Sequence, residues 1–388
     1  MAMTPGRRLA AAIAAATVLN GPYGTIYAFS VFLVALEAKL GVGRAQMSAV
    51  FALATITLTV GMNVSPRLYR VLPPSLIALG CGTLGAAGIA LAAAGTSYAQ
   101  VLFGFGVLFG LSAGIAFTLN QQCVNALMAK PSGLVNGYIV SHYPLGAMVG
   151  APLFGWSLER FGLEVTLGAI GAFLFCSGAT AAALYVLSRV ETRGRSASGS
   201  AAAAGHGRVL WILGTAFFLA AASGLMVMSQ AAAIVKAYGG GTALAVGATT
   251  FITGAIAAAR IAGGWLVDRF PVPWVAMFAN AWALAGGVLL TLVPDALVAV
   301  PALAMIGMGY GFTSGLTAAA IARYWDKSQV GAVAARLYIA WCVGAVTLPV
   351  IAGWLFDRTQ GYVAAVLIAA GINVAGIAVA SRLPQKLR

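Results

Sequence analysis

Apolar residues fall into long runs along this chain, and most polar residues gather in the short stretches between them. An α-helix needs about 18 or more such residues to cross a bilayer. Twelve runs reach this length, which predicts an all-α membrane protein with twelve transmembrane helices. They cover residues 9–36, 46–66, 74–94, 98–121, 134–157, 165–188, 209–234, 243–267, 274–293, 297–321, 331–355 and 361–381.

A stretch of small, polar and basic residues at 189–208 interrupts this pattern and has no apolar periodicity. It divides the twelve spans six and six. We therefore expect an N-terminal bundle over residues 1–188, a cytoplasmic linker over 189–208 and a C-terminal bundle over 209–388.

The two halves also resemble each other. A segment that begins Gly133-Leu-Val ends Gly155-Trp-Ser-Leu-Glu-Arg160, and a similar one begins Gly331-Ala-Val and ends Gly353-Trp-Leu-Phe-Asp-Arg358. Both landmarks recur at a spacing of 198 residues. Many secondary transporters consist of repeats of six spans, with the substrate site near the membrane midplane.

The net charge of +14 would suit a nucleic-acid-binding protein, but the charge is distributed as in a membrane protein. With the N-terminus inside, sixteen Lys and Arg residues lie on the inner side and five on the outer side. This bias predicts both termini in the cytoplasm, and for a bacterial chain a multi-pass protein of the inner membrane. We expect the lipid bilayer, and not nucleic acid, as the surrounding partner.

Arg260 stands apart from these topological charges, inside the apolar segment 249–267 and with no acidic residue within seven positions. A cation at the centre of a membrane helix costs about 2.5–3.5 kcal/mol on insertion scales, so such residues usually have a function. Arg260 either binds an anionic substrate or serves structurally, by reaching the inner headgroups or pairing with polar groups of another helix. The fixed fork of a guanidinium suits a carboxylate.

Four polar residues of span 1, Asn20, Tyr23, Tyr27 and Ser30, recur at steps of three and four and would share one helix face. They form either ordinary packing between helices or a wall of the substrate site with hydrogen-bond donors. The same two interpretations apply to the aromatic residues that could complete a cage, which are Phe117, Tyr310, Tyr338 and Trp341.

His142, two turns into span 5, either relays a proton or hydrogen-bonds to a neighbouring helix. No Asp or Glu lies in mid-membrane, so the coupling proton would travel on His142 or on the substrate carboxylate. The four cysteines lack metal-like spacing, and no nucleophile pairs with a base. We therefore expect a protein that is not an enzyme and that has no cofactor, metal site or catalytic residue.

Gly264-Trp-Leu-Val-Asp-Arg-Phe270 resembles the loop motif of the major facilitator superfamily, in the expected place between spans 8 and 9. Its counterpart after span 2, Gly61–Arg70, has Ser65 where the motif has Asp. The resemblance implies a major facilitator fold of two pseudo-symmetric six-helix bundles, and a monomer. It also implies that Asp268 and Arg269 help to latch the inward-closed state.

Three segments resemble the monocarboxylate and oxalate/formate transporter branch: 20–32, 126–137 and Arg260 itself, in the place of that branch's span 8 arginine. The resemblance implies a transporter of small monocarboxylates such as lactate or pyruvate. We hypothesise proton symport, because no Asp or Glu lies in mid-membrane. The alternative is an organic anion exchanger of the oxalate/formate type. Oxalate carriers have a second cation in span 11, which is absent over 338–347. Animal-type carriers have an Asp at the position of Ile256, so their proton scheme does not transfer to this chain.

Overall fold

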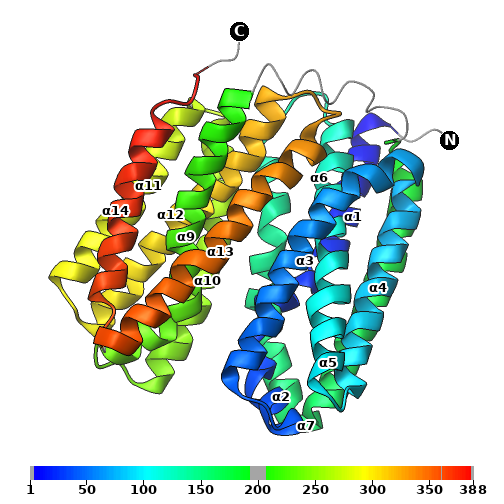
Figure 1. Ribbon diagram of the computed structural model, residues 1–388. Coiled ribbons are helices and arrows are strands. Elements are labelled where there is room, and N and C mark those ends of the chain that lie inside the picture. Colours follow the sequence, from blue (N-terminus) through cyan, green and yellow to red (C-terminus); the bar gives the residue numbers. More distant parts are fainter. Residues whose placement is uncertain (1–3, 193–206, 360, 386–388) are drawn as a thin grey trace. The chain divides into compact units, whose positions relative to one another are not determined.

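The computed structural model describes residues 4–192, 207–359 and 361–385. Within these ranges the regular structure is helical and no strand occurs, so the predicted all-α class is confirmed. Figure 1 shows long helices that lie side by side within each half of the chain. Their bounds are α1 (Pro5–Asn20), η1 (Pro22–Ile26), α2 (Ser30–Leu40), α3 (Arg44–Val71), α4 (Pro74–Ala94), α5 (Tyr98–Val101), η2 (Leu102–Phe109), α6 (Gly110–Leu127), α7 (Gly133–Ser188), α9 (Gly207–Ala237), α10 (Thr242–Val267), α11 (Val272–Leu292), α12 (Ala296–Tyr324), α13 (Val330–Thr359) and α14 (Val363–Ala380).

Eleven helical segments of the described chain are long and apolar enough to cross a membrane. One of them, α7, has 56 residues and contains a break at Gly162, where φ is +79°. A residue without a Cβ adopts this conformation easily. The break divides α7 into the predicted spans 5 and 6, and the twelve spans are thereby all accounted for.

Span 1 differs from the prediction of a single helix, because it is broken into α1, η1 and α2. Pro22 has no N–H to continue the α-helical ladder, and the chain tightens into a 3₁₀ turn after Asn20. Asn20, Tyr23, Tyr27 and Ser30 therefore do not lie on one continuous α-helix. The periodicity argument was wrong at this point because it ignored the proline.

Residues Gly61–Arg70, which resemble the loop motif only in part, are helical and do not form a loop. Helix α3 continues through Pro66 as far as Val71, whereas α10 ends at Val267, directly before Asp268. Ser65 is fully buried and donates a hydrogen bond to the Ile115 carbonyl oxygen of α6 at 3.1 Å. The two copies of the motif therefore differ in structure as well as in sequence.

The helices divide into two compact units that follow the sequence halves, except for the first residues of α7 and those around the start of α13. The predicted linker falls mainly on residues 193–206, which lie outside the described residues. Unit 1 comprises Met1–Lys130, His142–Gly199 and Trp325–Arg336; unit 2 comprises Pro131–Ser141, Ser200–Tyr324 and Leu337–Arg388.

Each unit has one central helix, and both central helices are rich in small residues. In unit 1, α6 packs against α1, α3 and α4; in unit 2, α12 packs against α9, α10 and α11. A Cβ added at Gly114 of α6 would collide with the Leu58 carbonyl of α3, and one added at Gly311 of α12 would collide with Ile256 of α10. Such close approach of helix backbones is how membrane helices gain packing energy.

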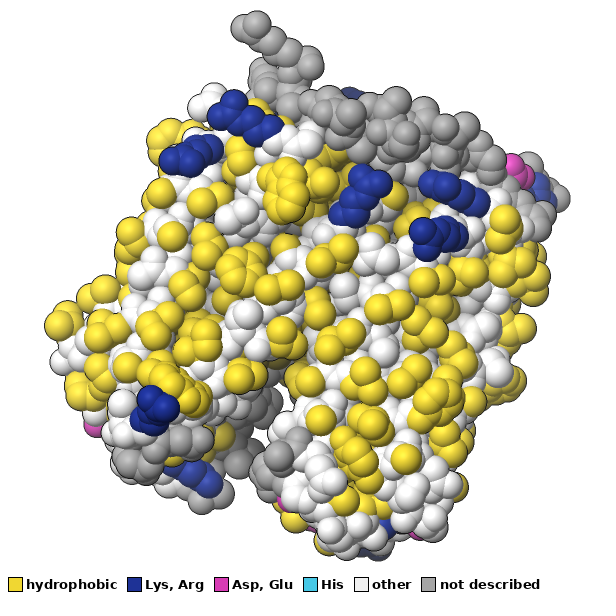
Figure 2. Space-filling view, viewed as in Figure 1, with side chains coloured by type: hydrophobic (Ala, Val, Ile, Leu, Met, Phe, Trp, Pro, Cys, Tyr) yellow, Lys and Arg dark blue, Asp and Glu magenta, His cyan; other side chains and the backbone are white. Residues whose placement is uncertain are grey.

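Apolar side chains cover the sides of the helices, and Lys and Arg side chains gather near the helix ends (Figure 2). The exposed apolar residues include Val60, Phe173, Trp211 and Leu297. Lipid tails suit such a surface. The chain is a multi-pass membrane protein.

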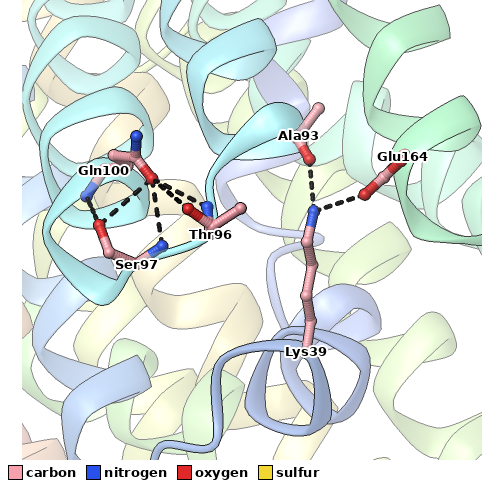
Figure 3. Close-up of polar contacts among 6 residues, drawn as sticks. All are labelled: Lys39, Ala93, Thr96, Ser97, Gln100 and Glu164. Atoms are coloured by element: carbon pink, nitrogen blue, oxygen red, sulfur yellow. Dashed lines mark hydrogen bonds and ion pairs between the residues drawn. The ribbon is translucent and has the colours of Figure 1, made fainter.

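At one end of unit 1, Lys39 ties the end of α2 to two other elements (Figure 3). Its ammonium nitrogen donates to the carbonyl oxygen of Ala93 at 2.6 Å and to Glu164 Oε1 at 2.8 Å. Ala93 lies in the last turn of α4, where carbonyl groups lack helical partners. Glu164 directly follows the break in α7, between spans 5 and 6, and Lys39 lowers its pKa through a hydrogen bond and through charge.

We predict that Glu164→Gln slightly lowers the melting temperature at neutral pH, since an exposed ion pair contributes little. The folded pKa of Glu164 lies below its ordinary value of 4.5. Its contribution is therefore complete above 4.5 and disappears as the pH falls through the folded value. Lys39→Met should lower the melting temperature more, because the Ala93 carbonyl loses its partner too. Melting curves in detergent at several pH values measure both effects. An equal loss for both variants would contradict this assignment.

Candidate functional site

Arg260 lies in the C-terminal half of α10, and glycines fix its backbone on two sides. A Cβ at Gly315 of α12 or at Gly137 of α7 would collide with the Arg260 carbonyl oxygen. Only residues without side chains allow the three helices to approach here. Gly137 belongs to the segment 131–141 of unit 2, so this packing is internal to that unit.

The Arg260 side chain is 2% exposed and donates two described hydrogen bonds. Nη1 donates to the Val140 carbonyl oxygen at 2.6 Å, and Nη2 donates to the Tyr310 hydroxyl oxygen at 2.7 Å. The guanidinium carbon also lies 5.1 Å from the centre of the Tyr310 ring, within the range of a cation–π contact. Neutral groups of two other helices thus hold this buried cation.

Tyr310 accepts a second hydrogen bond, from Trp341 Nε1 at 2.7 Å. Trp341 pairs with Tyr338 at 5.8 Å between ring centres, and Tyr338 meets Phe217 edge-on at 5.3 Å. Gly224 of α9 makes room for the Tyr310 side chain, because a Cβ at that position would collide with it. The structure therefore brings together Arg260, Tyr310, Tyr338 and Trp341, four residues that the sequence had proposed from three separate spans. Phe217 had not been proposed.

A second aromatic cluster lies in unit 1 and is centred on Tyr143, which the sequence reasoning missed. The ring centre of Tyr143 lies 5.3 Å from that of Phe117, 6.3 Å from that of Tyr23 and 6.4 Å from that of Tyr27. Tyr143 lies between His142 and Pro144, and no spacing rule singled it out. The candidate residues Tyr23, Tyr27 and Phe117 therefore do come together.

The polar atoms of this cluster are not equivalent. The hydroxyls of Tyr23 and Tyr143 donate to the backbone carbonyls of Cys81 at 2.8 Å and Ala113 at 2.6 Å. Tyr27 is half-buried, and its hydroxyl has no hydrogen-bond partner among the described residues. Asn20 is fully buried at the end of α1, and neither atom of its amide has a partner there. Tyr27 and Asn20 thus retain hydrogen-bonding capacity for a ligand.

His142 is 4% exposed, and its Nε2 lies 3.1 Å from Thr17 Oγ1 of α1. The Thr17 hydroxyl itself donates to the Ile13 carbonyl oxygen at 2.9 Å. The contact joins α7 to α1, and the tautomer of the ring decides which partner donates. The histidine is therefore anchored between two helices of unit 1.

The Asp268 carboxylate binds the N-terminus of α7. Oδ1 accepts from the Gly133 N–H at 2.7 Å and Oδ2 accepts from the Leu134 N–H at 3.0 Å. These are amide groups of the first helical turn, where a negative charge is favoured. Arg269 instead stacks on Trp265 of the same chain segment, with its guanidinium carbon 3.8 Å from the ring centre. Asp268 therefore contacts another helix through its side chain, whereas Arg269, the other predicted latch residue, stacks within its own segment.

Unit 1 contains a similar contact at the start of α13, which the sequence had not indicated. Gln122 of α6 accepts from the Gly331 N–H at 2.9 Å and donates to the Lys327 carbonyl at 2.9 Å. The Lys327 ammonium donates in turn to the carbonyls of Met128 and Ala129, just past the end of α6. Gln122 thus does with a neutral amide in one unit what Asp268 does with a charge in the other.

The helices form two sequence repeats of six spans, and the buried cation Arg260 lies in the second. A family model matches both repeats. The model described as Major Facilitator Superfamily matches residues 13–331 and 212–386. The chain belongs to the Major Facilitator Superfamily. This major facilitator is accordingly a membrane transporter and not an enzyme.

Among similar proteins are two called monocarboxylate transporter 13. The one from Rattus norvegicus is 25% identical over 378 residues, and the one from Bos taurus is 26% identical over 377. Each alignment covers 94% of this chain and 86% of the relative. An uncharacterized MFS-type transporter of Escherichia coli, YhjX, is 24% identical over 83% of this chain and 82% of its own.

Solved structures of similar fold include two sugar carriers. The proton:xylose symporter XylE superposes with a TM-score of 0.75 at 13% identity, over 99% of this chain and 98% of its own. FucP in the outward conformation superposes with a TM-score of 0.75 at 17% identity, over 97% of this chain and 98% of its own. At these identities the similarity establishes the major facilitator fold.

We predict that Tyr310→Phe lowers the free energy of unfolding by about 1–3 kcal/mol, because the buried donors Arg260 Nη2 and Trp341 Nε1 lose a shared acceptor. Thermal melting in detergent measures the loss. Tyr27→Phe is the matched control, since the hydroxyl it removes has no described partner, and it should leave the melting temperature nearly unchanged. Equal stability of the two variants would show that the Tyr310 bonds contribute nothing.

Proposed function

We propose that this major facilitator carries small monocarboxylates of the lactate or pyruvate type across a bacterial inner membrane, with both termini in the cytoplasm. The observation that carries the proposal is a buried arginine in a membrane helix, held by neutral oxygen atoms and enclosed by Tyr310, Tyr338 and Trp341. A carboxylate supplies the negative charge that suits such a site. The relatives named monocarboxylate transporter 13 support the substrate class.

One cation favours a monoanion. A second carboxylate without a matching charge would be costly to bury. Over 338–347, the residues that α13 contributes include Tyr338 and Trp341 but no Lys or Arg. The apolar cage suits a short carbon chain beside the carboxylate. In unit 1, the Asn20 amide and the Tyr27 hydroxyl are the groups we assign to ligand contact, while Tyr23 and Phe117 shape the aromatic cluster.

We propose proton symport as the mode of coupling. No Asp or Glu lies within the central part of a predicted span, so a side-chain carboxylate is not the proton carrier. The proton travels on the substrate carboxylate or on His142. A histidine titrates near neutral pH, which suits a proton that has to be taken up and released in each cycle.

In proteoliposomes, uptake of radiolabelled L-lactate should saturate, accelerate with an inward proton gradient and disappear in Arg260→Ala. The control is Arg358→Ala, which removes an exposed arginine that stacks on Trp354 of its own helix. It should retain uptake. Uptake that is indifferent to Arg260→Ala would refute the site.

The same vesicles separate symport from exchange. Preloading with unlabelled oxalate should not accelerate uptake of a labelled anion if the protein is a monocarboxylate symporter. Acceleration by internal oxalate, with no response to the proton gradient, would favour the organic anion exchanger instead. His142→Gln should reduce the gradient response if His142 carries the proton, and should leave it intact if the substrate carboxylate does.

A further inference from the structure

Helix α11 carries three aromatic side chains in a line. Trp274, Phe278 and Trp282 follow one another at steps of four residues, so they lie on one face over about 12 Å of helix. Trp274 is 60% exposed, Phe278 is 45% exposed and Trp282 is half-buried. We call these three residues the aromatic stripe. It begins in the first turn of α11 and reaches the middle of the helix.

Neighbouring helices of unit 2 hold the inner edges of these rings. The ring centres of Phe278 and Trp282 lie 5.9 Å apart, and Phe278 meets Phe312 of α12 edge-on at 5.5 Å. Trp282 also packs against a buried cluster that contains Ala259 of α10 and Phe312. Because these contacts already fix the rings, an acyl chain laid on their exposed edges buries apolar surface without ordering the side chains further.

Two arginines lie at the end of α10, just before α11 begins. Arg323 Nη1 donates to the Val267 carbonyl oxygen at 2.7 Å, and Arg269 Nη1 donates to the Trp265 carbonyl oxygen at 3.4 Å. Both guanidinium groups are therefore next to the last turn of α10. Both side chains are exposed, and neither forms an ion pair with a described residue. No carboxylate of the described chain balances these two charges.

The neighbouring carboxylate, that of Asp268, is already bound. Its two oxygen atoms accept hydrogen bonds from the Gly133 and Leu134 N–H groups, where a helix N-terminus favours negative charge. Arg269 instead stacks on Trp265, with its guanidinium carbon 3.8 Å from the ring centre. Stacking orients the plane of the guanidinium and leaves its N–H edge for an anion, and that edge matches a phosphate group in shape.

We propose that this surface binds one anionic phospholipid of the cytoplasmic leaflet. Arg269 and Arg323 hold the phosphate, and the aromatic stripe holds an acyl chain. Trp265 and Trp274 lie at the level of the headgroups, where tryptophan is common in membrane proteins. The charge bias of the chain places this end of α10 on the inner side, and basic clusters on that side attract anionic lipids. The lipid site is separate from the proposed substrate site and does not depend on it.

A lipid fits this surface better than a soluble protein or a free anion does. The stripe continues into the part of α11 that is apolar enough to cross a membrane, where a soluble partner cannot reach. A free phosphate would use the arginines and leave the aromatic rings without a ligand. A zwitterionic headgroup would bring its own cation close to both arginines, so phosphatidylglycerol should bind more tightly than phosphatidylcholine.

The test measures the quenching of tryptophan fluorescence by lipids that carry bromine midway along their acyl chains. The protein is placed in phosphatidylcholine nanodiscs that contain a small fraction of brominated phosphatidylglycerol or of brominated phosphatidylcholine. At equal fractions, the brominated phosphatidylglycerol should quench the wild type more strongly. Trp282→Phe should remove most of this excess, because it keeps an aromatic ring and removes the fluorophore. Arg269→Ala should weaken binding of phosphatidylglycerol by about tenfold, because the phosphate loses a charged donor.

Arg358→Ala is the matched control, because Arg358 is an exposed arginine that stacks on Trp354 at 4.1 Å. The helix that follows it, α14, contains no aromatic residue, so this variant should keep the excess. Equal quenching of the wild type by the two brominated lipids would overturn the proposal and leave the surface to another partner. An excess that survives Arg269→Ala or Trp282→Phe would overturn it too. So would an excess that Arg358→Ala removes equally, because it would then depend on net charge alone.

Discussion

A guanidinium buried in a membrane helix has to be solvated by the protein, and the packing around Arg260 is arranged to do so. Tyr310 can reach the guanidinium because Gly224 leaves space for its ring, and Val140 can reach it because Gly137 brings α7 onto α10. Each neighbour is thus placed by a glycine: Gly224 of α9 faces Tyr310, and Gly137 lies on the same helix as Val140. The charge itself dictates where small residues are needed, and the small residues dictate how closely the helices of unit 2 approach.

The two sequence repeats bind the start of a helix with different chemical groups. Helix α7 begins at a carboxylate, that of Asp268, whereas α13 begins at the amide of Gln122. A carboxylate interacts with the helix dipole as well as with the N–H groups, whereas a neutral amide contributes mainly its hydrogen bonds. Ser65 stands where the motif has Asp, and its hydroxyl is turned to the Ile115 carbonyl. The amide on the neighbouring helix α6 binds the start of α13 instead, and Lys327 bridges to the end of α6.

Long spans were predictable from the sequence, because hydrophobic length is a direct consequence of bilayer thickness. The break within span 1 was less so, since Pro22 acts through backbone geometry that hydropathy does not register. The break at Gly162, in contrast, falls between the predicted spans 5 and 6. Arg260 was found because a charge in an apolar run is conspicuous, and Tyr310, Tyr338 and Trp341 were found with it. Tyr143, Phe217 and Gln122 were missed for a common reason: each takes part through contacts between distant segments, and nothing in its own neighbourhood marks it.

The contrast between the two aromatic clusters bears on what each can do. In unit 2 the Tyr310 hydroxyl accepts two hydrogen bonds from buried donors, so a ligand anion competes with it for the charge of Arg260. In unit 1 the hydroxyls of Tyr23 and Tyr143 are bound to backbone carbonyls, which fixes the rings and occupies both hydroxyls. Because an unpaired buried amide is costly, Asn20 is the position in unit 1 where a polar group of a substrate would gain most.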